Sequence, residues 1–191
     1  GCVEASRFAA RHGIPHVLEV NAPLLREAER WRGLRDDGAL LALEREIFLG
    51  AYAVLAVSRE VGLSVGAHGV PAHRLLVRPN AVDAHLFRPR PRTSSVAGLL
   101  IREETFVVGF HGRLRPWHGL PMLARAFARV LERGVDATLL LAGEGDWRAG
   151  LEGLVPEDRL LVVGWRPQEE IARIVARFDV LALSYASDEP C

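Results

Sequence analysis

Short apolar segments alternate with amphipathic segments along most of the chain. The apolar segments have three to five residues and read as buried strands, at residues 16–20, 53–57, 75–77, 106–110, 138–142, 160–163 and 180–183. Between them, apolar residues recur at helical spacing, as in the run Leu123, Phe127, Val130 and Leu131. Short strands that alternate with helices predict an α/β fold with parallel sheets covered by helices on both faces.

Several residues predict where individual helices begin and end. Ser58 follows a strand and can accept a backbone N–H bond as the N-cap of the next helix. Pro121 suits the first turn of a helix, where its missing N–H has no intrahelical partner to lose. A helix over residues 24–35 is expected to end at Gly33 or Gly38.

The sequence changes in character at residues 88–95, which read RPRPRTSS and have no apolar periodicity. We therefore expect the C-terminal part of one Rossmann-like domain in residues 1–88, a linker in residues 89–104 and the N-terminal part of a second such domain in residues 105–191. The chain starts at glycine rather than methionine, so we expect a piece of a longer protein. Each half has only about 90 residues, which predicts weak stability and no turnover for the chain alone.

Composition and charge exclude some classes of protein. The 24 basic side chains balance the 24 acidic ones, which argues against nucleic acid as a partner. No apolar run approaches the roughly 18 residues of a membrane span. The two cysteines stand at the two ends of the chain and give no disulfide framework, which predicts a reducing, cytoplasmic setting. All basic residues other than histidine are arginine, which is typical of a GC-rich bacterial genome.

Ligands of open parallel sheets bind at the carboxyl ends of the strands. In the second half, this rule selects the loops at 111–120, 143–146 and 164–168 and the segment that begins at Ser184. In the first half it selects residues 79–83.

Several short motifs, in one order, resemble the GT-B glycosyltransferases of family 4. In the first half they are Ser58, GVP at 69–71 with Arg74, PNAVD at 79–83 and FRP at 87–89. In the second half they are VGFHGRL at 108–114, WHG at 117–119, AGEG at 142–145, Gly164 with Pro167, EIA at 170–172 and FDV at 178–180. The resemblance extends from about residue 14 to the end of the chain.

The resemblance implies transfer of a sugar from a nucleotide-diphosphate sugar to an acceptor, with retention at the anomeric carbon and without a cofactor or a metal. The resemblance leaves the acceptor open among a glycan, a lipid and a small molecule. The donor would lie mostly on the second domain, at Gly112, Arg113, His118, Gly143, Glu144, Gly145 and Arg166. Arg113 matches the family's arginine, whose planar fork suits a phosphate. Glu189, in Asp188-Glu189-Pro190, would be the catalytic glutamate that contacts the transferred sugar.

At four positions the sequence departs from the family pattern. His118 replaces the usual lysine, and would need a nearby anion to stay protonated at neutral pH. Ala81 replaces a glycine, which would cost about 1 kcal/mol if the backbone needs a positive φ there. Asn21 stands where the family has a histidine, and Cys191 where it has an aromatic residue.

These departures leave other interpretations open. The protein could be a non-catalytic relative that binds sugar nucleotides or acts as a scaffold, or another GT-B enzyme such as a sugar-nucleotide epimerase. Arg113 could be a surface arginine paired with a carboxylate, and the glycines could serve turn geometry alone. The helix over residues 24–35 combines arginines with Trp31, so a peripheral contact with the inner face of the membrane is the alternative to an ordinary amphipathic helix.

Overall fold

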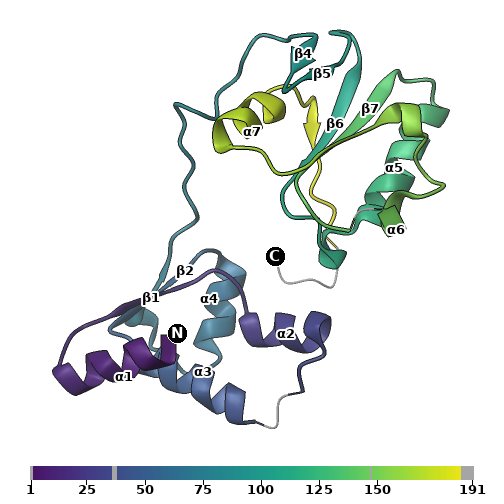
Figure 1. Ribbon diagram of the computed structural model, residues 1–191. Helices are drawn as coiled ribbons and strands as arrows, with labels where there is room; N and C mark the ends of the chain where they lie inside the picture. The colour runs from purple at the N-terminus through teal and green to yellow at the C-terminus, as the bar shows by residue number, and fades with distance from the viewer. Residues whose placement is uncertain (1, 36–37, 147, 186–191) are drawn as a thin grey trace. The chain divides into compact units, whose positions relative to one another are not determined.

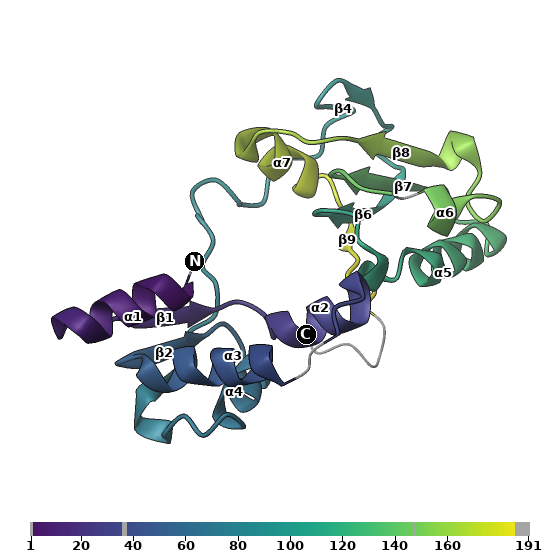
Figure 2. The ribbon, with the colours of Figure 1, turned by 60° about the horizontal axis from the view of Figure 1, so that its bottom comes forward.

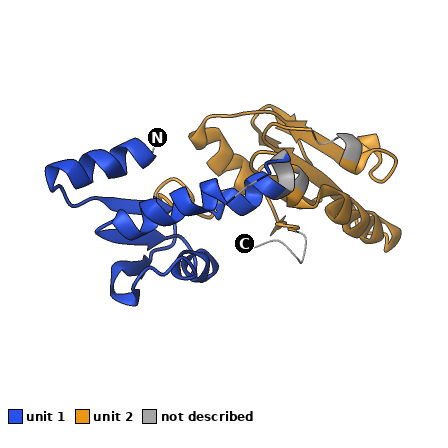
Figure 3. Ribbon diagram, turned by 90° about the horizontal axis from the view of Figure 1, so that it is seen from below, with its two compact units in different colours: residues 1–81, 190–191 blue, residues 82–189 orange. Residues whose placement is uncertain are grey.

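A computed structural model of the chain describes residues 2–35, 38–146 and 148–185, and the chain forms two compact units (Figures 1 and 3). The boundary between them falls at Ala81 and Val82. The sequence predicts a boundary at residue 88 and a linker over residues 89–104, whereas in the structure residues 89–104 are part of the second unit. No helix among the described residues is long and apolar enough to cross a membrane.

The first unit contains a three-stranded parallel sheet in the order β1-β2-β3. Its strands are β1 (Val17–Val20), β2 (Ala53–Ala56) and β3 (Leu75–Val77), and its helices are α1 (Cys2–His12), α2 (Leu24–Arg32), α3 (Ala39–Gly50) and α4 (Arg59–Gly66). A 3-10 turn at Ala72–Arg74 leads into β3. The core consists of side chains from the sheet, from α3 and α4 and from the segments that follow these helices, namely Val20, Phe48, Ala51, Val54, Ala56, Val61, Val65 and Val70.

Polar side chains close the helix ends of this unit. The Ser58 hydroxyl accepts a hydrogen bond from the Val61 N–H at 3.2 Å, which confirms the predicted N-cap of α4. The Arg74 guanidinium donates to the carbonyls of Leu49 and Ala51, both at 3.1 Å. These carbonyls lie at the C-terminal end of α3, where no intrahelical donor remains, so Arg74 satisfies them from outside the helix.

Two glycines bracket the loop between α2 and α3. Gly33 has φ of 64° and caps the C-terminus of α2, as one of the two predicted ends of that helix. Gly38 has φ of 92° and is the N-cap of α3. Helix α1 was not predicted from the sequence. It packs beside α3, with Ser6 buried near Gly50 and an ion pair of 3.0 Å between Arg7 and Glu46.

The second unit contains a four-stranded parallel sheet in the order β8-β7-β6-β9 (Figure 2). Its strands are β6 (Phe106–His111), β7 (Ala137–Ala142), β8 (Leu160–Val163) and β9 (Val180–Leu181), and its helices are α5 (Leu120–Glu132), α6 (Arg148–Leu151) and α7 (Gln168–Val175). Short 3-10 turns lie at Pro116–His118 and Glu157–Arg159. Pro121 lies in the first turn of α5, as predicted.

Alternate residues of the central strands pack on opposite faces of this sheet. One set belongs to the core with α5 and α6 and comprises Val108, Phe110, Leu139 and Leu141. The other set, Val107, Leu140 and Ala142, belongs to the core with α7. Since successive side chains of a strand point to opposite faces, both faces are covered by helices. The structure confirms the predicted α/β fold with parallel sheets.

A β-hairpin that the sequence did not reveal covers the α7 face. Its strands are β4 (Ser95–Val96) and β5 (Leu99–Leu100), and the two-residue loop has φ of 50° at Ala97 and 79° at Gly98. Positive φ at both loop residues gives the turn the twist that a tight hairpin requires. Val96 and Ile101 are each only 5% exposed, packed in the core with α7, which explains why this polar, proline-rich stretch belongs to the second unit.

Candidate functional site

The strand order of the second unit creates a topological switch point between β6 and β9. From β6 the chain proceeds to β7 and then β8 on one side, and it returns through α7 to β9 on the other side. In open parallel sheets, ligands bind at the carboxyl edge beside such a point. Here these loops are residues 112–119 after β6 and the segment from Ala182 after β9.

Contacts with Ser184 and Tyr185 hold the two loops together. The Ser184 hydroxyl donates to the His118 carbonyl at 2.7 Å, and the Tyr185 ring meets the His118 ring edge-on, with centroids 5.2 Å apart. Gly119 has φ of 60°, and a Cβ there would overlap the Ser184 carbonyl. The sequence pointed to the segment from Ser184 onward but not to these contacts, because His118 lies 66 positions before Ser184 in the chain.

The loops after β6 and β7 are also in direct backbone contact. The Gly112 N–H donates to the Ala142 carbonyl at 3.0 Å, and the Leu114 N–H donates to the Glu144 carbonyl at 2.7 Å. Gly143 and Gly145 have φ of 146° and 143°, and a Cβ on either would overlap a carbonyl oxygen of the facing loop. Contact between the loops therefore accounts for these glycines without a ligand.

His118 is half-buried among aromatic rings. Its ring centroid lies 5.2 Å from that of Phe110 and 6.0 Å from that of Trp117. Burial lowers the pKa of His118 below its ordinary value, and the charge of Arg115 acts in the same direction, whereas a hydrogen bond with the Arg113 backbone opposes them. The Nδ1 atom lies 3.3 Å from the Arg115 N–H and accepts a hydrogen bond from it, which leaves the proton of the neutral ring on Nε2.

Cationic groups stand at the same edge of the sheet. Arg113 is exposed, and its guanidinium forms no ion pair with any residue that the structure describes. The Arg115 guanidinium lies 5.7 Å from the centre of the Trp117 ring. The N-terminus of α5 begins directly after this loop, so the positive end of its dipole adds to the local potential. The edge is therefore suited to an anionic ligand.

The other residues predicted for the site, Glu144, Arg166 and Glu189, belong to other segments of the second half of the chain. Glu144 is exposed in the loop after β7, and its backbone carbonyl is engaged by Leu114. Arg166 follows β8 and forms an ion pair of 3.5 Å with Glu170, so its charge is partly neutralised. Glu189 lies outside the described residues. Trp165, which the sequence did not single out, is 68% exposed beside Arg166 and presents a flat apolar ring near the carboxyl end of β8.

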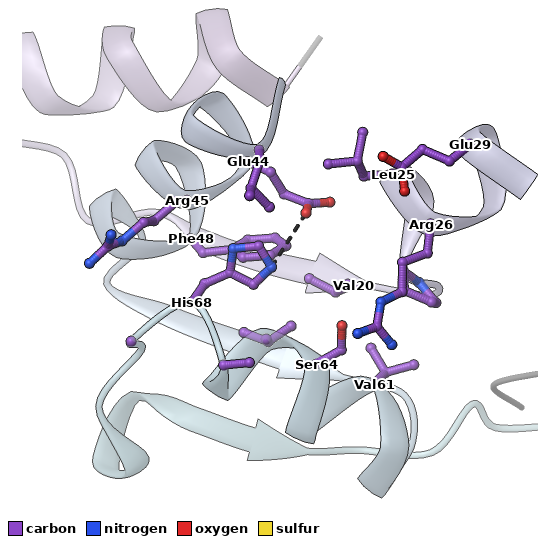
Figure 4. A pocket seen from close by; sticks show the side chains of 15 residues that line it. Val20, Leu25, Arg26, Glu29, Glu44, Arg45, Phe48, Val61, Ser64 and His68 are labelled. Atoms are coloured by element: carbon purple, nitrogen blue, oxygen red, sulfur yellow. Dashed lines mark ion pairs between the residues drawn. The ribbon is translucent and has the colours of Figure 1, made fainter. Parts of the chain in front are cut away.

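The first unit contains a pocket of about 520 Å³ near the carboxyl end of β1 (Figure 4). Its floor is apolar and includes Val20 and Phe48, and residues from α2, α3 and the end of α4 surround it. Arg26 and Glu29 line it from α2, and His68 on the far side forms an ion pair of 3.5 Å with Glu44. Acidic and basic groups therefore stand together around an apolar floor, which is the usual composition of a site for a small polar molecule.

In the first unit, the structure shows the surroundings of two residues that depart from the family pattern, Asn21 and Ala81. Asn21, which follows β1, donates from its amide to the Glu19 carboxylate at 3.0 Å. Ala81 does not have a positive φ, since Ala97 is the one non-glycine residue with positive φ among the described residues. Alanine in place of glycine at position 81 therefore carries no backbone strain.

Comparison with known proteins assigns a class to the second unit. Residues 105–190 match the family described as Glycosyl transferases group 1. The whole chain is similar to the 2-deoxystreptamine glucosyltransferase of Streptomyces kanamyceticus, with 29% identity over 98% of this chain and 46% of that protein. It also resembles the D-inositol 3-phosphate glycosyltransferase of Segniliparus rotundus, with 28% identity over 68% of this chain and 30% of that protein. The chain thus spans less than half the length of these relatives.

Solved structures share the fold of both units. The HepE protein of Anabaena, in complex with UDP-glucose, has a TM-score of 0.75 at 23% identity, over 96% of this chain and 50% of that one. Sucrose-phosphate synthase of Thermosynechococcus elongatus has a TM-score of 0.62 at 20% identity, over 99% of this chain and 55% of that one. The chain therefore has the α/β fold of GT-B glycosyltransferases, and residues 105–190 are similar in sequence to the glycosyltransferase group 1 family.

Proposed function

We propose that the protein is a family 4 glycosyltransferase that transfers a sugar from a nucleotide-diphosphate sugar with retention of configuration, without a cofactor or a metal. The observation that carries the proposal is the switch point between β6 and β9, where Arg113, His118 and the N-terminus of α5 gather at one edge of the sheet. The names of the sequence relatives support sugar transfer. The complexes of HepE with UDP-glucose and with UDP support a uridine nucleotide as the donor to test first.

The chemistry follows from the charge that the reaction develops. The bond between the anomeric carbon and the diphosphate oxygen breaks, and the electron pair leaves with the diphosphate. The acceptor hydroxyl oxygen forms the new bond, and its proton passes to the departing diphosphate. In this proposal the Arg113 guanidinium and the N-terminus of α5 stabilise the leaving group as its charge grows, since fixed cations and N–H donors act most strongly on developing charge.

His118 plays a conditional part in this scheme. In the free protein its lowered pKa favours the neutral ring at pH 7. A bound diphosphate raises the pKa of a neighbouring imidazole, because a nearby anion favours the charged form. We therefore propose that His118 donates to the diphosphate and takes up a proton when the donor binds.

The pocket of the first unit is the proposed site for the acceptor (Figure 4). Glu29 lines it and has no ion-pair partner among the described residues, so its carboxylate is available to a hydroxyl or an ammonium group. The name of the Streptomyces relative makes 2-deoxystreptamine the first acceptor to test. Glu29→Gln is expected to raise the KM for an amine-bearing acceptor and to leave donor binding unchanged.

The deciding experiment is calorimetric titration of UDP, GDP and ADP into the protein, its Arg113→Ala variant and an Arg125→Ala control. Arg125 is exposed on α5, so the control removes an equal charge from outside the loop after β6. We expect one nucleotide to bind, and Arg113→Ala to weaken it by about tenfold or more, because a charged hydrogen bond contributes about 1.5 to 3 kcal/mol. Equal loss in both variants would contradict the proposed site.

Binding without transfer is the alternative, and the residues that depart from the family pattern, His118 and Asn21, favour it. A protein that binds a nucleotide diphosphate but neither hydrolyses nor transfers the sugar would be a non-catalytic relative. Where transfer occurs, the anomeric configuration of the product, read by NMR, tests retention. The rate in the presence of a chelator tests independence of metal.

A further inference from the structure

A second pocket, of about 580 Å³, lies inside the second unit at the opposite end of its strands. One wall is the segment from Arg88 to Ala97, which the β4-β5 hairpin anchors to the core with α7 (Figure 1). The other wall is the C-terminal end of α7, with Arg173, Ala176 and Arg177. The Asp179 N–H donates to the Val107 carbonyl nearby, so this is the amino edge of the sheet.

Four arginines line this pocket, which we name the arginine pocket: Arg88, Arg90, Arg173 and Arg177. No aspartate or glutamate is among the described residues that line it. Arg88 and Arg173 are exposed and form no ion pair within the described part of the chain. Arg90 donates through Nη2 to the Leu86 carbonyl at 3.2 Å, while its buried Nε has no hydrogen-bond partner among the residues that the structure describes.

Arg177 is the buried member of the group, at 3% exposure. Its Nη2 donates to the carbonyls of Arg102 and Thr105 at 2.8 and 3.1 Å, while Nε and Nη1 have no hydrogen-bond partner among the described residues. Its anion, Asp179, lies 3.6 Å from Nη1 and is shared with Arg92. Burial holds the pKa of Arg177 below its ordinary value, and the charge of Arg92 adds to this effect.

The fold alone explains only part of this cluster. The carbonyl end of α7 favours a cation in its last turn, which accounts for Arg173. Arg177 serves the carbonyls that precede β6. Arg90 serves the Leu86 carbonyl, but neither reason applies to Arg88. Both residues come from a different segment and add positive charge to the same pocket, where like charges repel.

We propose that the arginine pocket binds a phosphate-bearing anion, at a site separate from the carboxyl edge where the donor is placed. Guanidinium groups grip phosphate oxygens in pairs, and a group with several negative charges would offset the repulsion among the four arginines. The same chemistry is offered by a free phosphorylated compound and by the headgroup of an anionic phospholipid. The inference does not rest on the proposed transferase function.

The test uses inorganic pyrophosphate as the probe, titrated calorimetrically in the Arg113→Ala background so that the carboxyl edge contributes least. The test variant is Arg88→Ala with Arg173→Ala, because both side chains are exposed and their removal leaves the core intact. The matched control is Arg125→Ala with Arg129→Ala. It removes the same charge from α5, on the opposite face of the sheet.

We expect pyrophosphate to bind, and the Arg88 and Arg173 double variant to weaken binding by about tenfold or more, while the α5 control stays close to the parent. Affinity should fall as salt is added, because the contacts are between exposed charges. Absence of binding, or an equal loss in the control, would overturn the proposal. The double variant should leave nucleotide binding to the protein with Arg113 unchanged, so failure here is distinct from failure of the donor site.

A second experiment determines whether the phosphate belongs to a lipid headgroup or to a free compound. The protein is floated with vesicles of phosphatidylcholine alone and with vesicles in which part of the lipid is phosphatidylglycerol. Binding to the anionic vesicles that depends on Arg88 and Arg173 would support a headgroup as the ligand. Pyrophosphate binding without vesicle binding would support a free phosphorylated compound.

Discussion

Replacement of Gly143 by alanine tests how the loops of the carboxyl edge are held together. Gly143 has φ of 146°, and a Cβ at this position would overlap the Gly112 carbonyl oxygen and lie 2.8 Å from its carbon. The methyl group can be accommodated only if the loops after β6 and β7 move apart. Such a movement separates the Gly112 N–H from the Ala142 carbonyl and the Leu114 N–H from the Glu144 carbonyl, now at 3.0 and 2.7 Å.

The expected loss follows from these two effects. Alanine in a backbone conformation that favours glycine costs about 1 to 2 kcal/mol. Each hydrogen bond that is broken contributes about 1 kcal/mol net. We therefore expect Gly143→Ala to lower the free energy of unfolding of the second unit by about 3 to 4 kcal/mol, and to weaken nucleotide binding because the loop with Arg113 is displaced.

Hydrogen exchange detected by mass spectrometry at a series of urea concentrations measures the free energy of unfolding of the second unit separately from that of the first. Gly134→Ala is the control, because Gly134 also has a positive φ, 76°, but a Cβ there meets nothing within 4 Å. It should cost only the backbone strain, about 1 kcal/mol. If Gly143→Ala costs no more than Gly134→Ala, the close approach of the two loops does not stabilise the edge and the reasoning is refuted.

Three further changes test other parts of the structure. Ser58→Ala should lower stability by about 1 kcal/mol in urea unfolding, with Ser58→Asp retaining most of it as an alternative cap; equal losses would exclude the cap. Asp179→Ala should cost about 3 kcal/mol or more, because the buried Arg177 loses its anion, whereas Asp179→Asn, which still accepts from the Val107 N–H, should cost less. His118 has a folded pKa below the unfolded value near 6.5, so the unfolded state binds its proton more tightly and stability should fall as the pH drops through about 6.5. A His118→Gln variant should lack this part of the pH dependence. If the two proteins differ in free energy of unfolding by the same amount from pH 8 to pH 5, the prediction is contradicted.

The sequence predicted the sheets better than the segments around them. All seven predicted strands occur within a residue or two of their expected bounds, because a run of apolar residues can be buried in few other ways. The β4-β5 hairpin was missed because its strands have two residues each, in a stretch that reads as a polar linker. α1 was also missed, and it packs along α3 rather than on a strand.

At the candidate site, the loops were predictable and their contacts were not. The rule that ligands bind at strand ends selected the segments that hold Arg113, His118 and Ser184 before their neighbours were known. The sequence could not show that the Ser184 hydroxyl donates a hydrogen bond to the His118 carbonyl, because a contact between distant residues depends on the order of strands in the sheet. The aromatic surroundings that lower the pKa of His118 are likewise a result of packing.

Local pattern determined which parts of this chain are strands and helices, where helices are capped and which loops carry cations. These properties depend on a few adjacent residues and on their period of burial, so the sequence contains them directly. Tertiary structure alone decided that β9 lies beside β6, and that Gly143 and Gly145 face the backbone of another loop. It also brought Arg88 and Arg90 to the same hollow as Arg173 and Arg177. Such arrangements minimise the free energy of the whole packed unit, and no local segment specifies them.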